Sequence, residues 1–147
     1  MKIYLDTSVY NRPFDDQLQP RIWFETMAFF MILQLIEKQE TDLITSSVLA
    51  FENSNNPFAE RRRWVTNCLK LSEKDLSLND VIRERASNLE RQGIKPIDAL
   101  HLACAETGEA EYFLTCDDKI VKRYEENEMT ALNPVGFILR VTEEEKS

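Results

Sequence analysis

Four acidic residues of this 147-residue chain are spaced so that a parallel sheet would bring them together. Two of them, Asp6 and Asp117, directly follow short runs that read as strands, and Glu52 and Asp98 fall on segments that read as helices. Ligands of open parallel sheets bind beyond the carboxyl ends of the strands, where such residues are expected to lie. We therefore take Asp6, Glu52, Asp98 and Asp117 as the candidate site, with Asp118 as a second candidate for the fourth position.

A group of carboxylates of this kind requires a cation. Two carboxylates about 4 Å apart repel each other by roughly 4 kcal/mol at an effective dielectric constant of 20, so four together would not stay ionised alone. Oxygen-only ligands select hard ions, Mg²⁺ or Mn²⁺, and the set contains no His or Cys that would favour zinc. A divalent ion held in this way suits phosphodiester hydrolysis, because it activates water and stabilises charge on the leaving oxygen.

Each acidic residue also has an ordinary structural explanation. An aspartate after a strand is often a turn or N-cap residue, which applies to Asp6 and Asp117. Asp98 could interact with the dipole of its helix, and Glu52 alone could be a solvated helix residue. The coincidence of all four at one end of one sheet favours a functional site over these separate structural explanations.

The composition excludes several other kinds of site. A single histidine, His101, excludes HExxH zinc sites and three-His zinc cages. It lies three residues after Asp98, so both could face one side of a helix, and we take it as a packed or hydrogen-bonded residue rather than a metal ligand. The three glycines lie far apart, so neither a Walker loop nor a dinucleotide GxGxxG loop exists. Three cysteines without a CxxC pair favour reduced thiols and a cytoplasmic location over a disulfide framework.

The charge balance limits how a nucleic acid could bind. The chain has 18 basic and 26 acidic residues and a formal net charge of −8, so a polyanion must be met by a local basic patch. Lys119, Lys122 and Arg123 closely follow Asp117 and are the candidate RNA contacts. The run 61–63 of three arginines could contact RNA phosphate or an acidic partner, but consecutive residues spread around a helix, so we predict mainly a solvated face.

The elements that must position these residues alternate between strand and helix. Short apolar runs predict strands at 2–5, 42–45, 111–115 and 134–139. Amphipathic or apolar segments predict helices at 21–38, 48–52, 58–69, 80–92, 97–106 and 117–126. This alternation predicts one α/β domain over residues 1–141 with a largely parallel sheet, followed by an acidic tail, 142–147, that is predicted to be disordered.

The helix predicted at 21–38 carries apolar residues on more than one face. Such a helix is buried on two sides, or it buries one side in a partner chain, and the spread of Trp23, Phe24, Phe29 and Phe30 favours a homodimer. Its most apolar part, 27–36, is shorter than the ~20 apolar residues that span a membrane. No signal peptide precedes it, so we expect no membrane association.

Taken in order, these motifs resemble those of the PIN domain family, metal-dependent ribonucleases that include VapC-like toxins. The matching pieces span nearly the whole chain, and they are Ile3-Tyr4-Leu5-Asp6-Thr7-Ser8, Ser46-Ser47-Val48-Leu49-Ala50-Phe51-Glu52, Asp98-Ala99-Leu100-His101-Leu102-Ala103 and Leu114-Thr115-Cys116-Asp117-Asp118. The resemblance implies a three-layer α/β/α sandwich around a mainly parallel sheet, and a tendency to dimerise.

The resemblance also implies roles for individual residues. The acidic metal-binding quartet would be Asp6, Glu52, Asp98 and Asp117. Ser8 and Thr115 would orient carboxylates or water, with Asp118 beside them. The expected activity is Mg²⁺- or Mn²⁺-dependent endoribonuclease action by the toxin of a toxin–antitoxin pair.

Two other functions remain open at this point. One is a non-catalytic RNA-binding module, in which the acidic residues remain and the RNA is only held. The other is a Mg²⁺-dependent small-molecule phosphatase of the haloacid dehalogenase type, whose Asp-x-Asp motif is broken here because Ser8 stands in the second position.

Overall fold

Five short strands form one parallel sheet in the computed structural model, which describes residues 1–124 and 128–146. Across the sheet the order is β3 (Lys74–Leu76), β2 (Asp42–Ser46), β1 (Lys2–Leu5), β4 (Tyr112–Leu114) and β5 (Thr130–Leu132). Every neighbouring pair is parallel. After β1 the chain first forms β2 and β3 on one side of this strand and then β4 and β5 on its other side. A topological switch point therefore lies between β1 and β4, and ligands of such sheets bind at this point.

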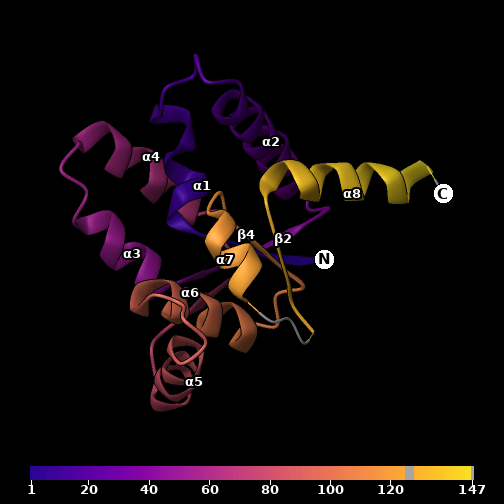
Figure 1. The fold of residues 1–147 in the computed structure, drawn as a ribbon. Coiled ribbons are helices and arrows are strands. Elements are labelled where there is room, and N and C mark those ends of the chain that lie inside the picture. Colours follow the sequence, from indigo (N-terminus) through magenta and orange to yellow (C-terminus); the bar gives the residue numbers. More distant parts are fainter. Residues whose placement is uncertain (125–127, 147) are drawn as a thin grey trace.

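Helices cover both faces of this sheet (Figure 1). On one side α2 (Pro20–Glu37) packs against α8 (Pro134–Lys146), and on the other α5 (Asp80–Glu90) packs against α6 (Pro96–Thr107). Coverage on both faces explains why the strands are near-continuous apolar runs, with every residue of Ile3–Leu5 fully buried. The expected three-layer α/β/α sandwich is confirmed.

Shorter helices gather at the carboxyl edge of the sheet. They are α1 (Thr7–Asn11), the 3₁₀ helix η1 (Arg12–Phe14), α3 (Ser47–Ser54), α4 (Ala59–Leu69) and α7 (Asp118–Arg123). Of these, α1 follows β1, α3 follows β2 and α7 follows β4 within a few residues. Side chains in their first turns therefore surround the ends of the central strands.

The strand predicted at 134–139 is wrong, because these residues begin helix α8. Pro134 stands at its first position, and the Asn133 side chain accepts a hydrogen bond from the Val135 N–H at 2.8 Å, a typical helix start. A six-residue apolar run cannot distinguish strand from helix by periodicity. Two strands were not predicted, and they are β5, which lies just before this turn, and β3 at the opposite edge of the sheet, each with three residues.

Other boundaries shift by smaller amounts. The segment between the predicted strand 2–5 and the predicted helix 21–38 contains η1 and the five-residue helix α1, which are too short to be recognised in the sequence. Helix α8 continues through 142–146, where the sequence predicted a disordered tail, and Ser147 lies outside the described residues. The helix predicted at 117–126 is observed as 118–123, and 125–127 also lie outside the described residues. In the described part of the chain, no helix has the length and hydropathy needed to cross a membrane.

Candidate functional site

Four predicted acidic residues line one small cavity at the carboxyl edge of the sheet. Asp6 comes from the end of β1, Glu52 from α3, Asp98 from α6 and Asp117 from the turn before α7. The cavity has a volume of about 160 Å³, and its remaining lining residues are Thr7, Ser8, His101 and Ile120. Residues up to 111 positions apart in the chain are thus brought to one place.

Asp6 is a buried carboxylate whose position is fixed by the start of α1. It is the N-cap of this helix and accepts hydrogen bonds from the backbone N–H of Ser8 at 3.0 Å and from the Ser8 hydroxyl. Burial raises the pKa of Asp6, and hydrogen bonds from Ser8 and Thr115 oppose that rise. The capping explanation therefore holds for Asp6, and the same side chain also lines the cavity.

Glu52 is held by partners from two other elements. The Thr7 hydroxyl donates to its carboxylate at 2.5 Å, and the His101 ring nitrogen Nε2 contacts the same oxygen. Burial alone would raise the pKa of Glu52, but the interactions with His101 and Thr7 outweigh it and lower the pKa. Glu52 is thus not a free solvated residue, and His101 is hydrogen-bonded as predicted.

A buried chain of hydrogen bonds continues from His101 into the core. The Tyr4 hydroxyl lies 2.7 Å from Nδ1 of His101 and 2.6 Å from the Ser46 hydroxyl. Burial raises the pKa of Tyr4, so the phenol keeps its proton and can donate to Nδ1. With Tyr4 as the donor to Nδ1, a neutral His101 ring would carry its proton on Nε2 and donate it to Glu52.

This chain of hydrogen bonds could not be predicted from the sequence. Tyr4 lies within an apolar run that predicts a strand, and Ser46 stands out in the sequence only as the first residue of the piece that ends at Glu52. The one available signal was the spacing between Asp98 and His101, which places both on one side of a helix. That signal identified His101 but could not identify its partners.

Asp98 shows that the four carboxylates influence one another. It lies in the first turn of α6, and burial raises its pKa. The charges of Asp6, Asp117 and Glu52 raise it further, and only His101 acts in the opposite direction. The cavity therefore concentrates negative charge to a degree that disfavours full ionisation.

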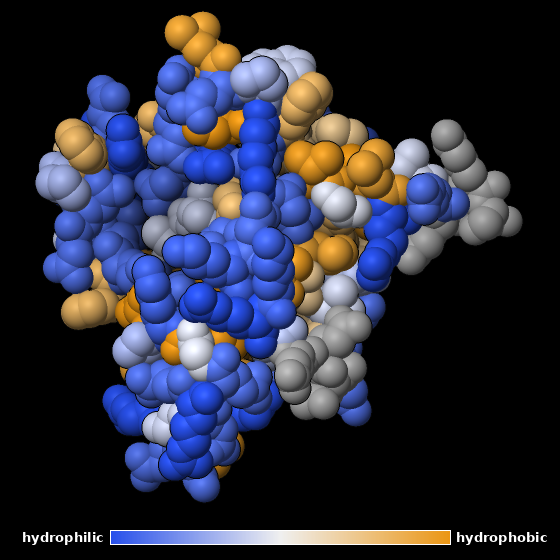
Figure 2. All heavy atoms as spheres, viewed as in Figure 1, coloured by the Kyte–Doolittle hydropathy of each residue, from blue (hydrophilic) through white to orange (hydrophobic). Residues whose placement is uncertain are grey.

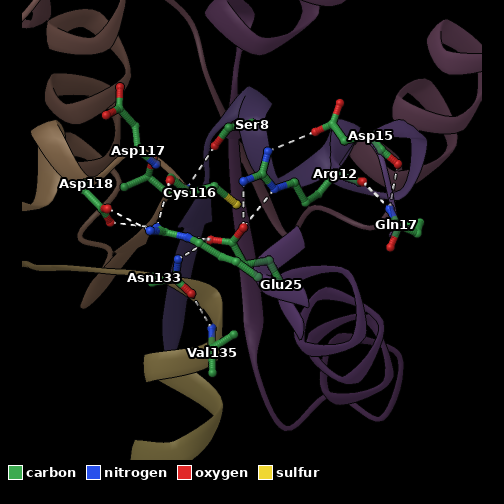
Figure 3. Close-up of polar contacts among 12 residues, drawn as sticks. Ser8, Arg12, Asp15, Gln17, Glu25, Cys116, Asp117, Asp118, Asn133 and Val135 are labelled. Carbon is green, nitrogen blue, oxygen red and sulfur yellow. Dashed lines mark hydrogen bonds and ion pairs between the residues drawn. The ribbon is translucent and has the colours of Figure 1, made fainter. Parts of the chain in front are cut away.

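Asp117 and Asp118 face different surroundings. Asp117 is the N-cap of α7, accepts from the Lys119 N–H at 2.9 Å, and lines the cavity. Asp118 instead forms a two-pronged ion pair with Arg21 of α2, at 2.7 and 2.8 Å. In Figure 3 dashed lines mark the contacts of the Asp118 carboxylate, whereas the Asp117 carboxylate points away from them. Asp118 is therefore not among the residues that line the cavity.

Ser8 and Thr115, the two residues predicted to orient carboxylates or water, hydrogen-bond to Asp6. The Ser8 hydroxyl accepts from the Cys116 N–H at 3.0 Å while it donates to Asp6. The Thr115 hydroxyl accepts from the Asp117 N–H at 3.1 Å, so it connects the end of β4 with the start of α7. Both hydroxyls thus join the segment that carries Asp117 to the segment that carries Asp6.

The predicted basic residues lie at one side of the cavity. Lys119 and Arg123 border a narrow recess together with Lys95, Asp98 and Asp117. The Arg123 guanidinium donates to the Gly93 carbonyl at 3.1 Å, which anchors it beside the start of α6. Lys122 is exposed on α7 and does not border this recess.

The donor set fits a hard divalent cation by its chemistry, because its oxygens carry charge that lacks compensation inside the cavity. The carboxylates face one cavity without converging on one point. Among residues 1–124 and 128–146, no three His, Cys, Asp or Glu side chains are close enough together to enclose an ion. Glu52 is held by His101 and Asp6 by Ser8, so a bound cation would require at least one carboxylate to turn.

A second buried carboxylate, Glu25, braces the elements behind the cavity (Figure 3). It is 1% exposed and accepts from Arg12 at 2.7 and 2.9 Å, from Arg21 at 3.3 Å and from the amide of Asn133. These contacts join α2 to η1 and to the turn before α8. The sequence did not reveal Glu25, because a single acid in an apolar helix resembles a solvated residue.

Comparison with known proteins identifies the family. The PIN domain family model matches residues 3–126, which is most of the chain, and the chain belongs to the PIN domain family. The family consists generally of nucleases, so a hydrolase acting on phosphodiester bonds is the class of protein that the fold and the site define. A search of curated proteins found no match to the sequence.

Two solved structures share this fold. The chain resembles a crystal structure of VapBC2 from Rickettsia felis bound to a DNA fragment from their promoter, with a TM-score of 0.58 and 18% identity over 90% of this chain and 98% of that one. It also resembles PAE2754 from Pyrobaculum aerophilum, with a TM-score of 0.61 and 14% identity over 97% of this chain and 90% of that one. At these identities the similarity establishes the fold.

Proposed function

We propose that this protein is a divalent-metal-dependent endoribonuclease. The observation that carries the proposal is that Asp6, Glu52, Asp98 and Asp117 line one cavity, where Asp98 has a pKa raised in part by the other three charges. A group of carboxylates that disfavours its own ionisation binds a divalent cation with relief of repulsion. Membership of the PIN domain family supports the nuclease class.

The proposed roles follow from the contacts. Asp6, Glu52, Asp98 and Asp117 would hold Mg²⁺ or Mn²⁺, with Asp117 favoured over Asp118 because Asp118 pairs with Arg21. When bound, such a cation lowers the pKa of a coordinated water and offsets negative charge on the scissile phosphate.

The remaining predicted residues would act around that group. Ser8 and Thr115 would orient Asp6 through their hydroxyls, whose hydrogen bonds oppose the rise of its pKa. Lys119, Lys122 and Arg123 would contact RNA phosphates beside the cavity, which would make binding sensitive to salt.

We propose further that this nuclease is the toxin of a toxin–antitoxin pair. The VapBC2 structure is a complex with DNA from its promoter, and the shared fold supports an antitoxin protein as a partner of this chain. Free thiols at Cys68, Cys104 and Cys116 support a cytoplasmic location.

We also infer a homodimer formed through α2. Trp23, Phe24, Phe30 and Met31 are exposed along one side of this helix, and Leu139 of α8 is exposed as well. Figure 2 shows hydrophobic side chains gathered where α2 meets the first part of α8. Exposed apolar patches of this kind mark association sites. Sedimentation equilibrium is expected to give twice the 17.2-kDa chain mass, and a mass of one chain would contradict the dimer.

The nuclease proposal is tested by RNA cleavage with Asp6→Asn as the inactive variant. Wild-type protein with Mn²⁺ is expected to cut total cellular RNA or a random RNA pool, and EDTA is expected to stop it. Asp6→Asn should lower the cleavage rate at least 100-fold. Its midpoint temperature of thermal unfolding in metal-free buffer should be unchanged or raised, because the substitution removes a buried charge. Asp118→Asn is the control and should retain activity.

Two results would count against the nuclease proposal. Full activity of Asp6→Asn would show that the cavity is not the catalytic site. Tight RNA binding by wild-type protein without any metal-dependent cleavage would instead identify a non-catalytic RNA-binding module.

A further inference from the structure

A groove larger than the acidic cavity lies on the other side of α3. Its volume is about 980 Å³, and it runs between α3 and α4 at the carboxyl ends of β2 and β3. Three basic side chains line it, Arg62, Arg63 and Lys70, against one acid, Asp75. The rest of the lining is mainly small or polar, and the groove therefore differs in charge from the cavity next to it.

The positive charge of this groove is available to a ligand. In the described residues, no carboxylate lies within ion-pair distance of Arg62, Arg63 or Lys70. The Arg62 guanidinium donates to the Asn56 carbonyl at 2.5 Å, which fixes its position at the groove edge without neutralising it. The Asp75 carboxylate accepts from the Thr45 hydroxyl at 2.8 Å. In a chain with net charge −8, such a group of cations is a local site for anions.

Helix α3 connects the groove to the acidic cavity. Ala50, Asn53 and Ser54 line the groove, and Glu52 lines the cavity. At about 100° per residue, Glu52 lies roughly opposite the centre of the groove-lining positions, and Phe51 lies between them on the outer side of the helix. Phe51 is 63% exposed. A chain that leaves the groove and enters the cavity by the outer surface must therefore pass over an exposed aromatic ring.

The geometry points to a path for single-stranded RNA across α3. The ribose–phosphate backbone binds in the groove through Arg62, Arg63 and Lys70, a base stacks on Phe51, and the next phosphodiester enters the acidic cavity. That the bound strand is a substrate rests on the proposed nuclease function. The acidic cavity repels a polyanion, so the attraction must come from a basic surface beside it. Cationic grooves with exposed aromatic rings are typical of sequence-tolerant single-strand binding.

Direct binding tests the groove without depending on cleavage. Fluorescence anisotropy measures the Kd of a labelled, unstructured 12-nucleotide RNA for the full chain in EDTA, where no metal-dependent cutting occurs. The double substitution Arg63→Glu with Lys70→Glu is expected to raise the Kd at least tenfold. The matched control, Arg83→Glu with Arg91→Glu on α5, makes the same charge change on exposed residues of another helix and should raise it less than threefold. An equal loss in both variants would overturn the groove assignment.

Substitutions of Phe51 test the stacking step and distinguish RNA from an acidic protein. Phe51→Leu keeps an apolar side chain without an aromatic face and is expected to weaken RNA binding about fivefold, whereas Phe51→Trp should retain it. Polyglutamate of equal charge serves as the competing ligand. Binding of polyglutamate with the affinity of RNA, unaffected by Phe51→Leu, would overturn the RNA path in favour of an acidic protein segment.

A cleavage assay of the same RNA separates this inference from the proposed function. Wild-type protein that binds through the groove but does not cut with Mn²⁺ would contradict the nuclease proposal alone. If the wild-type protein cuts the RNA and the groove variant binds and cuts it equally well, the RNA path across α3 is contradicted and the nuclease proposal is not.

Discussion

Glu52 depends for its orientation on side chains from two other elements. Thr7 and His101 both contact its carboxylate, and Tyr4 contacts the far side of the His101 ring. Tyr4 is fully buried and His101 is 1% exposed, so water cannot replace either partner. The Tyr4 hydroxyl thus holds the His101 ring from the side opposite Glu52, and His101 in turn orients the Glu52 carboxylate.

Tyr4→Phe tests this positioning role, because it removes one oxygen and leaves the ring packed against Phe113 at 5.5 Å. We expect the Mn²⁺ concentration for half-maximal cleavage to rise about tenfold, with the KM for RNA unchanged and a stability loss of about 1–2 kcal/mol. Tyr10→Phe is the control, because the buried Tyr10 hydroxyl has no hydrogen-bond partner in residues 1–124 and 128–146. An equal metal requirement in all three proteins would contradict the positioning role.

The raised pKa of Asp98 makes stability depend on pH when no cation is present. A carboxyl whose pKa is higher in the folded protein than the ordinary 3.8 binds its proton more tightly in the folded state. Stability therefore falls as the pH rises from 3.8 through the pKa of the folded protein. Asp98→Asn is therefore expected to raise the free energy of unfolding at pH 7 in EDTA by up to about 1 kcal/mol, since the group is partly exposed. Urea unfolding measures this, and the gain should shrink toward pH 4. A destabilised variant at pH 7 would contradict the assigned repulsion.

The identities of the four acids and of His101 could be read from residue type and spacing. Their partners could not, because Tyr4, Ser46 and Thr7 become neighbours of the acids only when β1, β2 and α6 are assembled. Likewise, the choice between Asp117 and Asp118 depends on Arg21, 97 positions away from Asp118. Long-range contacts of this kind leave no periodic signal in the sequence.

Helix α2 is held at its start by a buried charge rather than by apolar packing alone. Glu25 lies one turn into the helix from Arg21, and it gathers Arg12 of η1 and Asn133 at the turn before α8. A buried acid with several partners is costly to disrupt, because each partner is left without compensation.

Glu25→Ala is accordingly expected to lower the free energy of unfolding by about 3 kcal/mol. Arg21→Ala should cost less than about 1 kcal/mol, because the Arg21 side chain is 53% exposed and pairs with Asp118 in solvent. Urea denaturation of both variants provides the comparison. A loss for Arg21→Ala as large as that for Glu25→Ala would show that the exposed pair, not the buried acid, holds α2.

Most elements could be predicted because long amphipathic segments and buried strands have distinct periods. Pro20 and Pro96 each mark the first position of a helix, and β1 begins and ends where the apolar run does. The errors are two three-residue strands, β3 and β5, and the C-terminal helix α8. The apolar run 134–139 at the start of α8 has too few residues to show a helical period.

Charge is divided unevenly over the whole molecule. A chain with net charge −8 places acidic residues around one cavity, and in the groove on the other side of α3 it places cations that pair with no carboxylate of residues 1–124 and 128–146. Net charge alone argues against a polyanionic substrate, and only the folded arrangement shows that a local basic surface adjoins the acids. Membership of the PIN domain family is consistent with this division, because a nuclease must attract the strand whose phosphate enters an acidic site.

The central claim is that these carboxylates jointly bind a divalent cation. A crystal soaked in Mn²⁺, with diffraction recorded at an energy where manganese scatters anomalously, tests it most directly. The account predicts an anomalous peak in the cavity, about 2.1 Å from carboxylate oxygens of Asp6 and at least two of Glu52, Asp98 and Asp117. A crystal saturated with Mn²⁺ that shows no peak in this cavity, or a peak only elsewhere on the protein, would contradict it.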